Sequence, residues 1–219
     1  MGRITTREVM IDVAERLIAE RGLGSVSLRE VQTASGQRNK SAAHYHFGSR
    51  DGLIEAIVEA RMAPINQRRL GLLADLDVAG RGDDVRALVE ALIEPLAEAT
   101  LGRGHSAYAR FLAQALTDPG AATIVGRHLR AESFRAVRDR LAAAITASDI
   151  PAPLRMARVD RANRLGIISL AAWESGQFGH DLPLEARLAD LIDACVALIE
   201  APVSARTRTA LTQLDRSDG

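Results

Sequence analysis

Hydrophobic residues recur at helical spacing along almost the whole chain. In the first segment Val9, Val13 and Leu17 follow one another every fourth residue, the interval that lines one face of an α-helix. A threonine and a glutamate at capping-box spacing precede this stripe, and a glycine follows it. The pattern therefore predicts a first helix over residues 6–21.

The next segment divides into unusually short elements. Ser27 and Glu30 repeat the capping-box spacing and predict a helix over residues 28–34, which a glycine ends. A second short helix is expected from residue 39 or 40 to residue 45. A longer apolar stripe then predicts a helix over residues 50–62.

Beyond residue 62 the helical pattern continues with longer elements. Pro64 is expected in the first turn of a new helix, because proline is tolerated there. Further helices are predicted near residues 84–101, 108–116, 121–147, 154–177 and 184–200. No stretch alternates with the period of a β-strand. The sequence thus predicts an all-α fold of about nine helices.

These elements predict three regions. Residues 1–62 would form a small domain of three to four helices, in which two short helices joined by a tight turn make a helix-turn-helix. Residues 63–202 would form a larger helical bundle for ligand binding and dimerisation. Residues 203–219 lose strong periodicity and are expected to be a loose or partly helical tail.

Composition indicates the cellular compartment of the protein but not its function. The chain has 219 residues, with 28 basic and 28 acidic side chains, so its net charge gives no general sign of a nucleic-acid partner. No run approaches a membrane span, and charged residues interrupt the N-terminus where a signal peptide would be apolar. The single Cys195 fits a reducing compartment. We therefore expect a cytoplasmic protein with no membrane partner.

Local chemistry is concentrated in the stretch "GQRNKSAAHYHFGSR", residues 36–50. It holds the only lysine, two of the five histidines and one of the two tyrosines, and no acid. A helix in the DNA major groove needs cationic and hydroxyl groups for phosphates, and amide, imidazole or cationic groups for base edges. The candidate DNA-binding residues are Ser27, Arg38, Asn39, Lys40, Ser41, His44, Tyr45 and Arg50. The small Ala42 and Ala43 are expected to allow close approach to the groove.

Several of these residues have a plainer interpretation. Ser27 can act only as a helix cap, and Arg38 and Arg50 can be ordinary solvated charges. His46 is better explained as a packed, hydrogen-bonded histidine. His44 and His46 are two residues apart at a helix end with no third ligand nearby, so no metal site is expected.

Residues 4–62 resemble the DNA-binding domain of the TetR family of bacterial transcriptional regulators. The matching stretches are "IDVAERLIAERG", "SVSLREVQTASG" and "HYHFGSRDGLIEAIV". The gap between Gly36 and Phe47 is one residue longer than the commonest family form, and His44 stands where the family usually has a phosphate-binding tyrosine. The resemblance therefore implies a phosphate contact by either His44 or the adjacent Tyr45.

The resemblance also implies a homodimer that binds a palindromic DNA operator and leaves it when a small effector binds. For the dimer interface, small or apolar positions on the last two long helices are candidates: Gly166, Ser169, Trp173, Leu188, Leu191, Ile192 and Cys195. For an apolar or amphipathic effector, aromatic residues and one histidine are candidates: His105, Tyr108, Phe111, Phe134, Trp173 and Phe178. Plain core packing is the better explanation for any single effector candidate, and the interface stripes can also face only their own core, although a dimer is still favoured.

Two other function classes remain to be weighed. An enzyme needs a set of catalytic side chains at a recognisable spacing. The sequence has no phosphate loop, no paired zinc histidines and no Ser-His-Asp pattern in a supporting context. No catalytic residue and no cofactor is therefore predicted. A helical adaptor that binds another protein would explain the bundle but not the basic recognition helix. The sequence favours a sequence-specific transcriptional regulator, with the adaptor as the alternative.

Overall fold

The computed structural model describes residues 5–39, 41–102, 106–128, 132–147, 149–177 and 181–217, and these ranges contain α-helices and short 3-10 turns without a β-strand. The first four helices are α1 (Thr6–Arg21), α2 (Leu28–Ala34), α3 (Ala42–Phe47) and α4 (Arg50–Val78). Next come α5 (Val85–Leu101), α6 (Tyr108–Ala115), α7 (Pro119–His128) and α8 (Glu132–Ala144). The last three are α9 (Ala152–Glu174), α10 (Leu184–Glu200) and α11 (Ala205–Ser217). The all-α prediction is confirmed.

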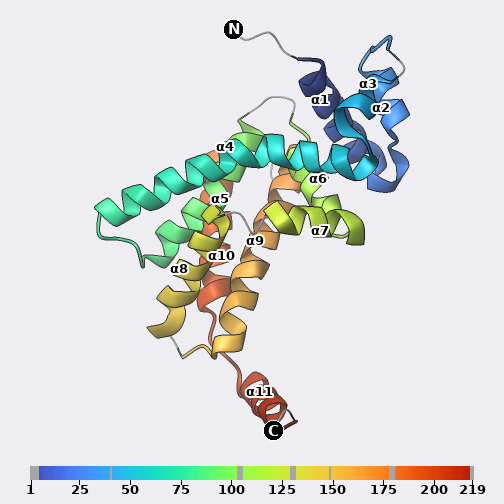
Figure 1. Cartoon of the computed structure of the whole chain (residues 1–219). Coiled ribbons are helices and arrows are strands. Elements are labelled where there is room, and N and C mark those ends of the chain that lie inside the picture. Colours follow the sequence, from blue (N-terminus) through green and yellow to red (C-terminus); the bar gives the residue numbers. More distant parts are fainter. Residues whose placement is uncertain are drawn as a thin grey trace.

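Helices α1, α2 and α3 gather with the start of α4 at one end of the molecule (Figure 1). We call residues 5–62 the head and residues 63–200 the body. Both capping boxes predicted for the head are present, with Thr5 capping α1 and Ser27 capping α2. The bounds predicted for α1 and α2 are confirmed, because their cap signals and their apolar stripes agree.

Helix α4 corrects the prediction of a new helix at Pro64. It runs unbroken over 29 residues from the head into the body, with Pro64 inside it. Met62 and Ile65 on either side of the proline are only 4% and 1% exposed. Burial of this continuous stripe therefore outweighs the one helical hydrogen bond that proline removes.

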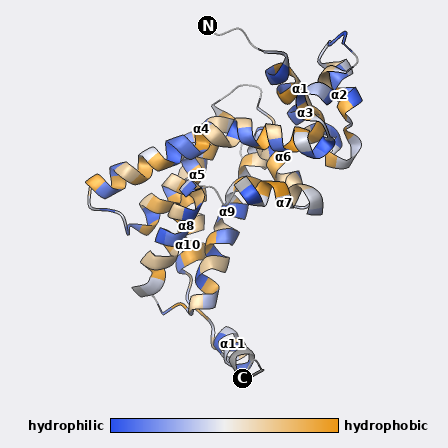
Figure 2. Cartoon of the chain, in the orientation of Figure 1, coloured by the Kyte–Doolittle hydropathy of each residue, from blue (hydrophilic) through white to orange (hydrophobic). Residues whose placement is uncertain are grey.

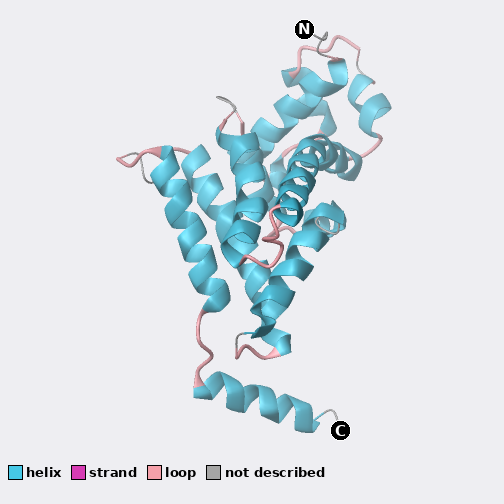
Figure 3. Ribbon diagram, turned by 90° about the vertical axis from the view of Figure 1, so that its left-hand side faces the viewer, coloured by secondary structure: helices cyan, strands magenta, loops and turns pink. Residues whose placement is uncertain are grey.

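Two further features bring the count to eleven helices in the described ranges, against about nine predicted. The predicted helix over residues 121–147 is instead α7 and α8, which lie on either side of residues 129–131, outside the described residues. The region expected to be a loose or partly helical tail contains α11, which lies at the far end of the body from the head (Figures 1 and 3). Arg208 ties α11 to Asp149 through a 2.5 Å ion pair.

The hydrophobic core is continuous between head and body. One cluster joins residues of α1 and α4 with Tyr108, Phe111 and Leu170 of the body helices α6 and α9. A second cluster lies among α5, α8, α9 and α10. By contrast, the loop between α2 and α3 is a hydrophilic stretch (Figure 2). The head is thus firmly packed on the body while its far side remains polar.

Part of the predicted dimer interface belongs to the chain's own core. Leu191, Ile192 and Cys195 are at most 5% exposed and pack within the second cluster. Gly166 faces α5, where a Cβ atom would lie 2.4 Å from Ile93 Cδ1. The structure thus places these four residues in the packing of one chain, which leaves them little surface for a partner copy. The half-buried Ser169, Trp173 and Leu188 remain candidates.

Substituting Gly166→Val tests the close packing of α9 on α5. The added atoms would meet the buried Ile93 side chain, so we expect a loss of about 2 kcal/mol in the free energy of unfolding. Urea denaturation at two protein concentrations measures this loss. An equal loss at both concentrations agrees with packing inside one chain, whereas a loss that disappears at high concentration would return Gly166 to the dimer interface.

Candidate functional site

Helices α2 and α3 face each other across a polar groove of about 550 Å³. Four of its lining residues are Arg29, Gln32, Arg38 and His44. The tight turn between the helices begins at Gly36, whose φ of 70° is a left-handed conformation that glycine adopts without strain. The head therefore presents basic, amide and imidazole groups around one concave surface.

Helix α3 separates its two faces sharply. His44 is exposed, and Tyr45 projects into solvent with 84% of its surface exposed. His46 is half-buried with its ring 6.1 Å from that of Phe47, which is buried in the head. His44 and Tyr45 are both free to contact a phosphate, so this alternative stays open.

Ala42 and Ala43 correct an expectation. They are 7% and 1% exposed and pack in the core of the head. Ala43 lines the groove between α2 and α3 but has almost no exposed surface there, so the small size of both residues serves chiefly the close approach of α3 to the rest of the head. A helix of six residues is too short for periodicity to indicate which side faces inward.

The turn before α3 is held by side chains that were predicted to contact DNA. Asn39 Oδ1 accepts hydrogen bonds from the backbone N–H and the hydroxyl of Ser41 at 3.1 and 2.9 Å. Arg38 and Asn39 are both exposed. Lys40, the remaining basic candidate, lies outside the described residues. Asn39 and Ser41 thus fix the entry of the chain into α3, and their contacts with DNA remain a prediction.

Ser27 and Arg50 have structural roles in the head. The Ser27 hydroxyl donates to Glu30 Oε2 at 2.8 Å and accepts from the Glu30 backbone N–H at 3.3 Å, which makes it the cap of α2. Arg50 donates from a guanidinium nitrogen to the Leu23 carbonyl at 2.6 Å and so anchors the loop after α1. The structure therefore favours the plainer interpretation of both residues.

Two residues of the groove were not identified from the sequence. Arg29 lies on the exposed side of α2 and has no acidic partner among the described residues, and Gln37 lines the groove beside Arg38. One signal in the sequence could have identified Arg29. It lies at the start of the predicted helix over residues 28–34, and the residue four positions later is Thr33 instead of an acid that could pair with it. Both residues join the proposed DNA surface.

The predicted effector residues are only partly brought together. Tyr108 and Phe111 stack on α6 with ring centroids 5.8 Å apart, and both are buried. Phe134 on α8 is buried in the second core cluster, and the half-buried Trp173 packs against both clusters. His105 and Phe178 lie outside the described residues. Tyr108, Phe111 and Phe134 are thus core residues of the body.

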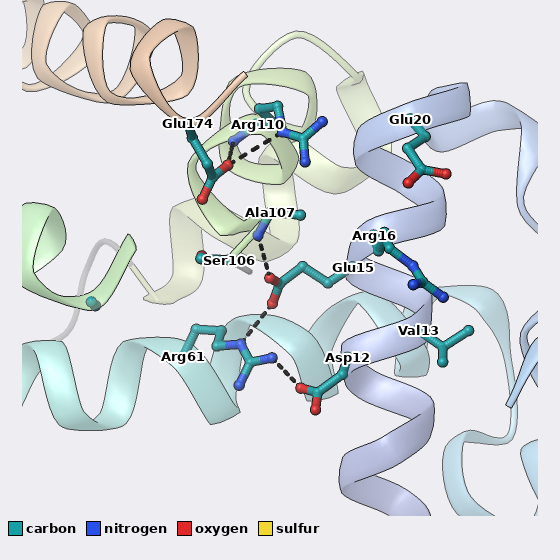
Figure 4. A pocket seen from close by; sticks show the side chains of 11 residues that line it. Asp12, Val13, Glu15, Arg16, Glu20, Arg61, Ser106, Ala107, Arg110 and Glu174 are labelled. Carbon is teal, nitrogen blue, oxygen red and sulfur yellow. Dashed lines mark hydrogen bonds and ion pairs between the residues drawn. The ribbon is translucent and has the colours of Figure 1, made fainter. Parts of the chain in front are cut away.

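A larger cleft of about 740 Å³, which we call the junction cleft, lies where the head meets the body. Its charged lining residues come from α1, α4, α6 and α9 (Figure 4). Glu15 of α1 accepts from Arg61 Nε of α4 at 2.6 Å and from the Ala107 backbone N–H at 3.0 Å. Asp12 pairs with the other side of the Arg61 guanidinium. One buried carboxylate thus joins the head, the long helix and the body.

A second carboxylate at the junction cleft orders α6. Glu174, at the end of α9, accepts from the Arg110 backbone N–H at 3.0 Å and lies 3.5 Å from Arg110 Nε. Burial raises the pKa of the Glu15 carboxyl, while the nearby Arg61 acts in the opposite direction. No local pattern indicates the Glu15–Arg61 pair, because the two residues are 46 positions apart in the chain.

Comparison with known proteins places the head in a family. Residues 10–57 match the family model described as bacterial regulatory proteins, tetR family. The HTH-type transcriptional repressor KstR2 of Rhodococcus jostii is 32% identical over 113 residues, which is 49% of each chain, so the match spans about half the length of that relative. The HTH-type transcriptional regulator AcrR of Shigella flexneri is 28% identical over 187 residues, 83% of this chain and 84% of that one.

Solved structures share the fold over nearly the whole length. AmtR of Mycobacterium smegmatis superposes with a TM-score of 0.60 at 21% identity and covers 96% of both chains. AibR, solved in complex with isovaleryl coenzyme A and operator DNA, superposes with a TM-score of 0.52 at 17% identity, covering 91% of this chain and 100% of that one. At these identities the likeness concerns the fold alone. No helix in the described ranges is both long and apolar enough to cross a membrane.

Proposed function

We propose, from the premise that this chain belongs to the TetR family of bacterial regulatory proteins, that it represses transcription as a homodimer and leaves its operator when an effector binds. Family membership itself makes the chain a DNA-binding transcriptional regulator. Repression is supported by the name of the relative KstR2. The dimer, the palindromic operator and the release by effector are our proposals.

The observation that carries the proposal is the surface around the groove between α2 and α3. Arg29, Gln37, Arg38 and His44 line it and Tyr45 is exposed on α3, and none of them has an acidic partner among the described residues. Cations suit phosphates, and amide and imidazole groups suit base edges. Together with Asn39, Ser41 and Lys40, these residues form the DNA surface that we propose.

A dimer is proposed because one head of this size makes few base contacts. Two heads on a two-fold symmetric site roughly add their binding free energies. The last two long helices of the body offer surface for a partner copy. Ile168 of α9 and Leu184 of α10 are 52% and 40% exposed, near the half-buried Trp173 and Leu188. Two-fold pairing of these helices would cover the exposed apolar groups.

Release by an effector requires that the effector bind better to a state whose heads are wrongly spaced. We propose that α4 transmits this difference, because it is continuous between head and body. The Arg61–Glu15 pair and the hydrogen bond from Gln114 Nε2 to the Ala19 carbonyl, 3.2 Å, make further connections. The effector is proposed to be a small apolar or amphipathic molecule that binds near Tyr108, Phe111, Phe134 and Trp173.

Fluorescence anisotropy with DNA from upstream of the gene, at several salt concentrations, tests the proposal. We expect one fragment to bind far more tightly than the others, with affinity that falls steeply as salt rises, because phosphate contacts release counterions. Light scattering should give twice the chain mass. Equal affinity for every fragment at all salt concentrations would favour the helical adaptor instead.

A further inference from the structure

A cation without an anionic partner lies in the core of the body. Arg69 of α4 is 3% exposed, and its guanidinium donates only to neutral acceptors. These are the carbonyls of Ala91 and Leu92 at 3.3 and 3.2 Å, Asn66 Oδ1 at 3.2 Å and Ser133 Oγ at 3.4 Å. Burial lowers the pKa of Arg69 to about 10, so the group is still charged at neutral pH.

One of the two carbonyl contacts has a structural explanation. Pro95 lies inside α5 and has no N–H, so the Ala91 carbonyl four residues earlier loses its helical donor. Arg69 supplies the missing donor. A neutral donor would serve equally, so the proline explains this hydrogen bond but not the charge of Arg69.

The other inward-facing arginines are compensated. Arg61 pairs with Glu15 and Arg110 faces Glu174. Arg158 is 8% exposed and donates to the Ile199 carbonyl at the C-terminus of α10, where the helix dipole supplies negative potential. The carbonyls at Arg69 lie within α5 rather than at its end. A buried charge normally has an oppositely charged partner. Among the described residues Arg69 has none, so it departs from this rule.

A second unsatisfied group lies near Arg69. Tyr108 of α6 is 1% exposed, and its hydroxyl has no hydrogen-bond partner among the described residues. Tyr108 belongs to the same core cluster as Ile65 and Leu96, which lie one helical turn from Arg69 and from its acceptor Leu92. The Tyr108 ring stacks on Phe111. A cation and an unused hydroxyl donor therefore lie in neighbouring turns of the body core, beside the Phe111 ring.

We propose that Arg69 and the Tyr108 hydroxyl bind the carboxylate of an organic acid whose apolar part packs against Phe111. A carboxylate would accept from one guanidinium nitrogen and from the phenol at charge-assisted distances, shorter than the present contacts of 3.2 and 3.4 Å to Asn66 and Ser133. Those two side chains already bond each other at 2.7 Å, so releasing Arg69 leaves neither unpaired.

The proposed carboxylate site also lies where binding can change the position of the head. This step rests on the proposed function. Because Arg69 and Tyr108 are buried, a carboxylate reaches them only when α4 and α8 part. Helix α4 also carries Arg61, which holds Glu15 of the head. Tyr108 follows Ala107, whose N–H donates to the same carboxylate. Binding of the acid therefore displaces the elements that position the head.

Isothermal titration of the full-length protein with matched ligand pairs tests the site. The probes are butyrate, octanoate and benzoate, each against the alcohol of the same skeleton. We expect at least one acid to bind about tenfold or more tightly than its alcohol, because only the acid supplies the missing charge. Equal binding of acids and alcohols would overturn the proposal.

The variant Tyr108→Phe separates binding from folding. It keeps the ring stack and removes only a hydroxyl that has no partner, so the melting temperature and the operator affinity without effector should be unchanged or higher. Affinity for the acid should fall about tenfold. Arg69→Gln should abolish the preference for acids, whereas Arg68→Gln, on an exposed neighbour paired with Glu98, should not. Full acid affinity in Tyr108→Phe would contradict the assignment.

Operator titrations on the same samples separate the two proposals. Release of the operator by an alcohol but by no acid would overturn the carboxylate site and leave the repressor intact. Acid binding with the stated dependence on Tyr108, in a protein that binds no DNA sequence specifically, would support the site and overturn the repressor.

Discussion

The double substitution of Arg38 and His44 by alanine is expected to lower operator affinity about 1,000-fold. Both side chains are exposed at the groove between α2 and α3, and neither has an intramolecular partner that its loss would leave unpaired. A lost phosphate or base contact typically costs about 1 kcal/mol or more, and a dimer loses four of them. Anisotropy titration at one fixed salt concentration measures the change.

A matched control removes a cation elsewhere. Arg206→Ala lies on the exposed side of α11, at the far end of the body from the head, and should leave operator affinity within twofold of the original, roughly the size of a screened long-range charge effect. Neither variant should change the melting temperature, because the residues are exposed. Unchanged affinity in the double variant would place the reading surface elsewhere.

Glu15→Gln is expected to reduce the free energy of unfolding by about 3 kcal/mol. The Glu15 side chain is 4% exposed, and its two oxygens accept from Arg61 and from the Ala107 backbone. Removing its charge leaves Arg61, which is 21% exposed, with only the outer Asp12 as a partner. Chemical denaturation measures the loss. Because the pair joins head to body, the response of operator affinity to effector should weaken as well.

Asp12→Asn supplies the comparison on the same arginine. Asp12 is 61% exposed, so solvent screens its pair with Arg61 and its loss should cost less than about 1 kcal/mol. Equal effects of the two substitutions would show that burial of Glu15 contributes nothing, and would remove the basis for its role between head and body.

Local signals predicted elements well wherever two of them agreed. Both α1 and α10 were predicted with the observed bounds, because each has an apolar stripe that stops at clear end signals. The prediction of a new helix at Pro64 was wrong because it relied on the proline alone, whereas the apolar stripe of α4 continues beyond the proline. The sequence between α7 and α8 has no glycine or proline in residues 129–131 that would have indicated two helices.

The candidate site was predictable in composition but not in geometry. The basic and polar stretch before and within α3 marked the surface, and the structure brings Arg38 and His44 together at one groove. The inward orientation of Ala42 and Ala43, and the bond from Arg50 to Leu23, depend on tertiary contacts. The Arg50 contact joins residues 27 apart, so no local pattern encodes it.

Selection of binding sites from random double-stranded DNA, followed by footprinting of the selected sequence, tests whether the head recognises a DNA sequence. We expect a two-fold symmetric sequence with half-sites about one helical turn, or a multiple of it, apart. We also expect this enrichment to disappear in the Arg38→Ala, His44→Ala variant. Failure to enrich any sequence with the folded protein would contradict the assignment of α2 and α3 as a DNA-reading surface.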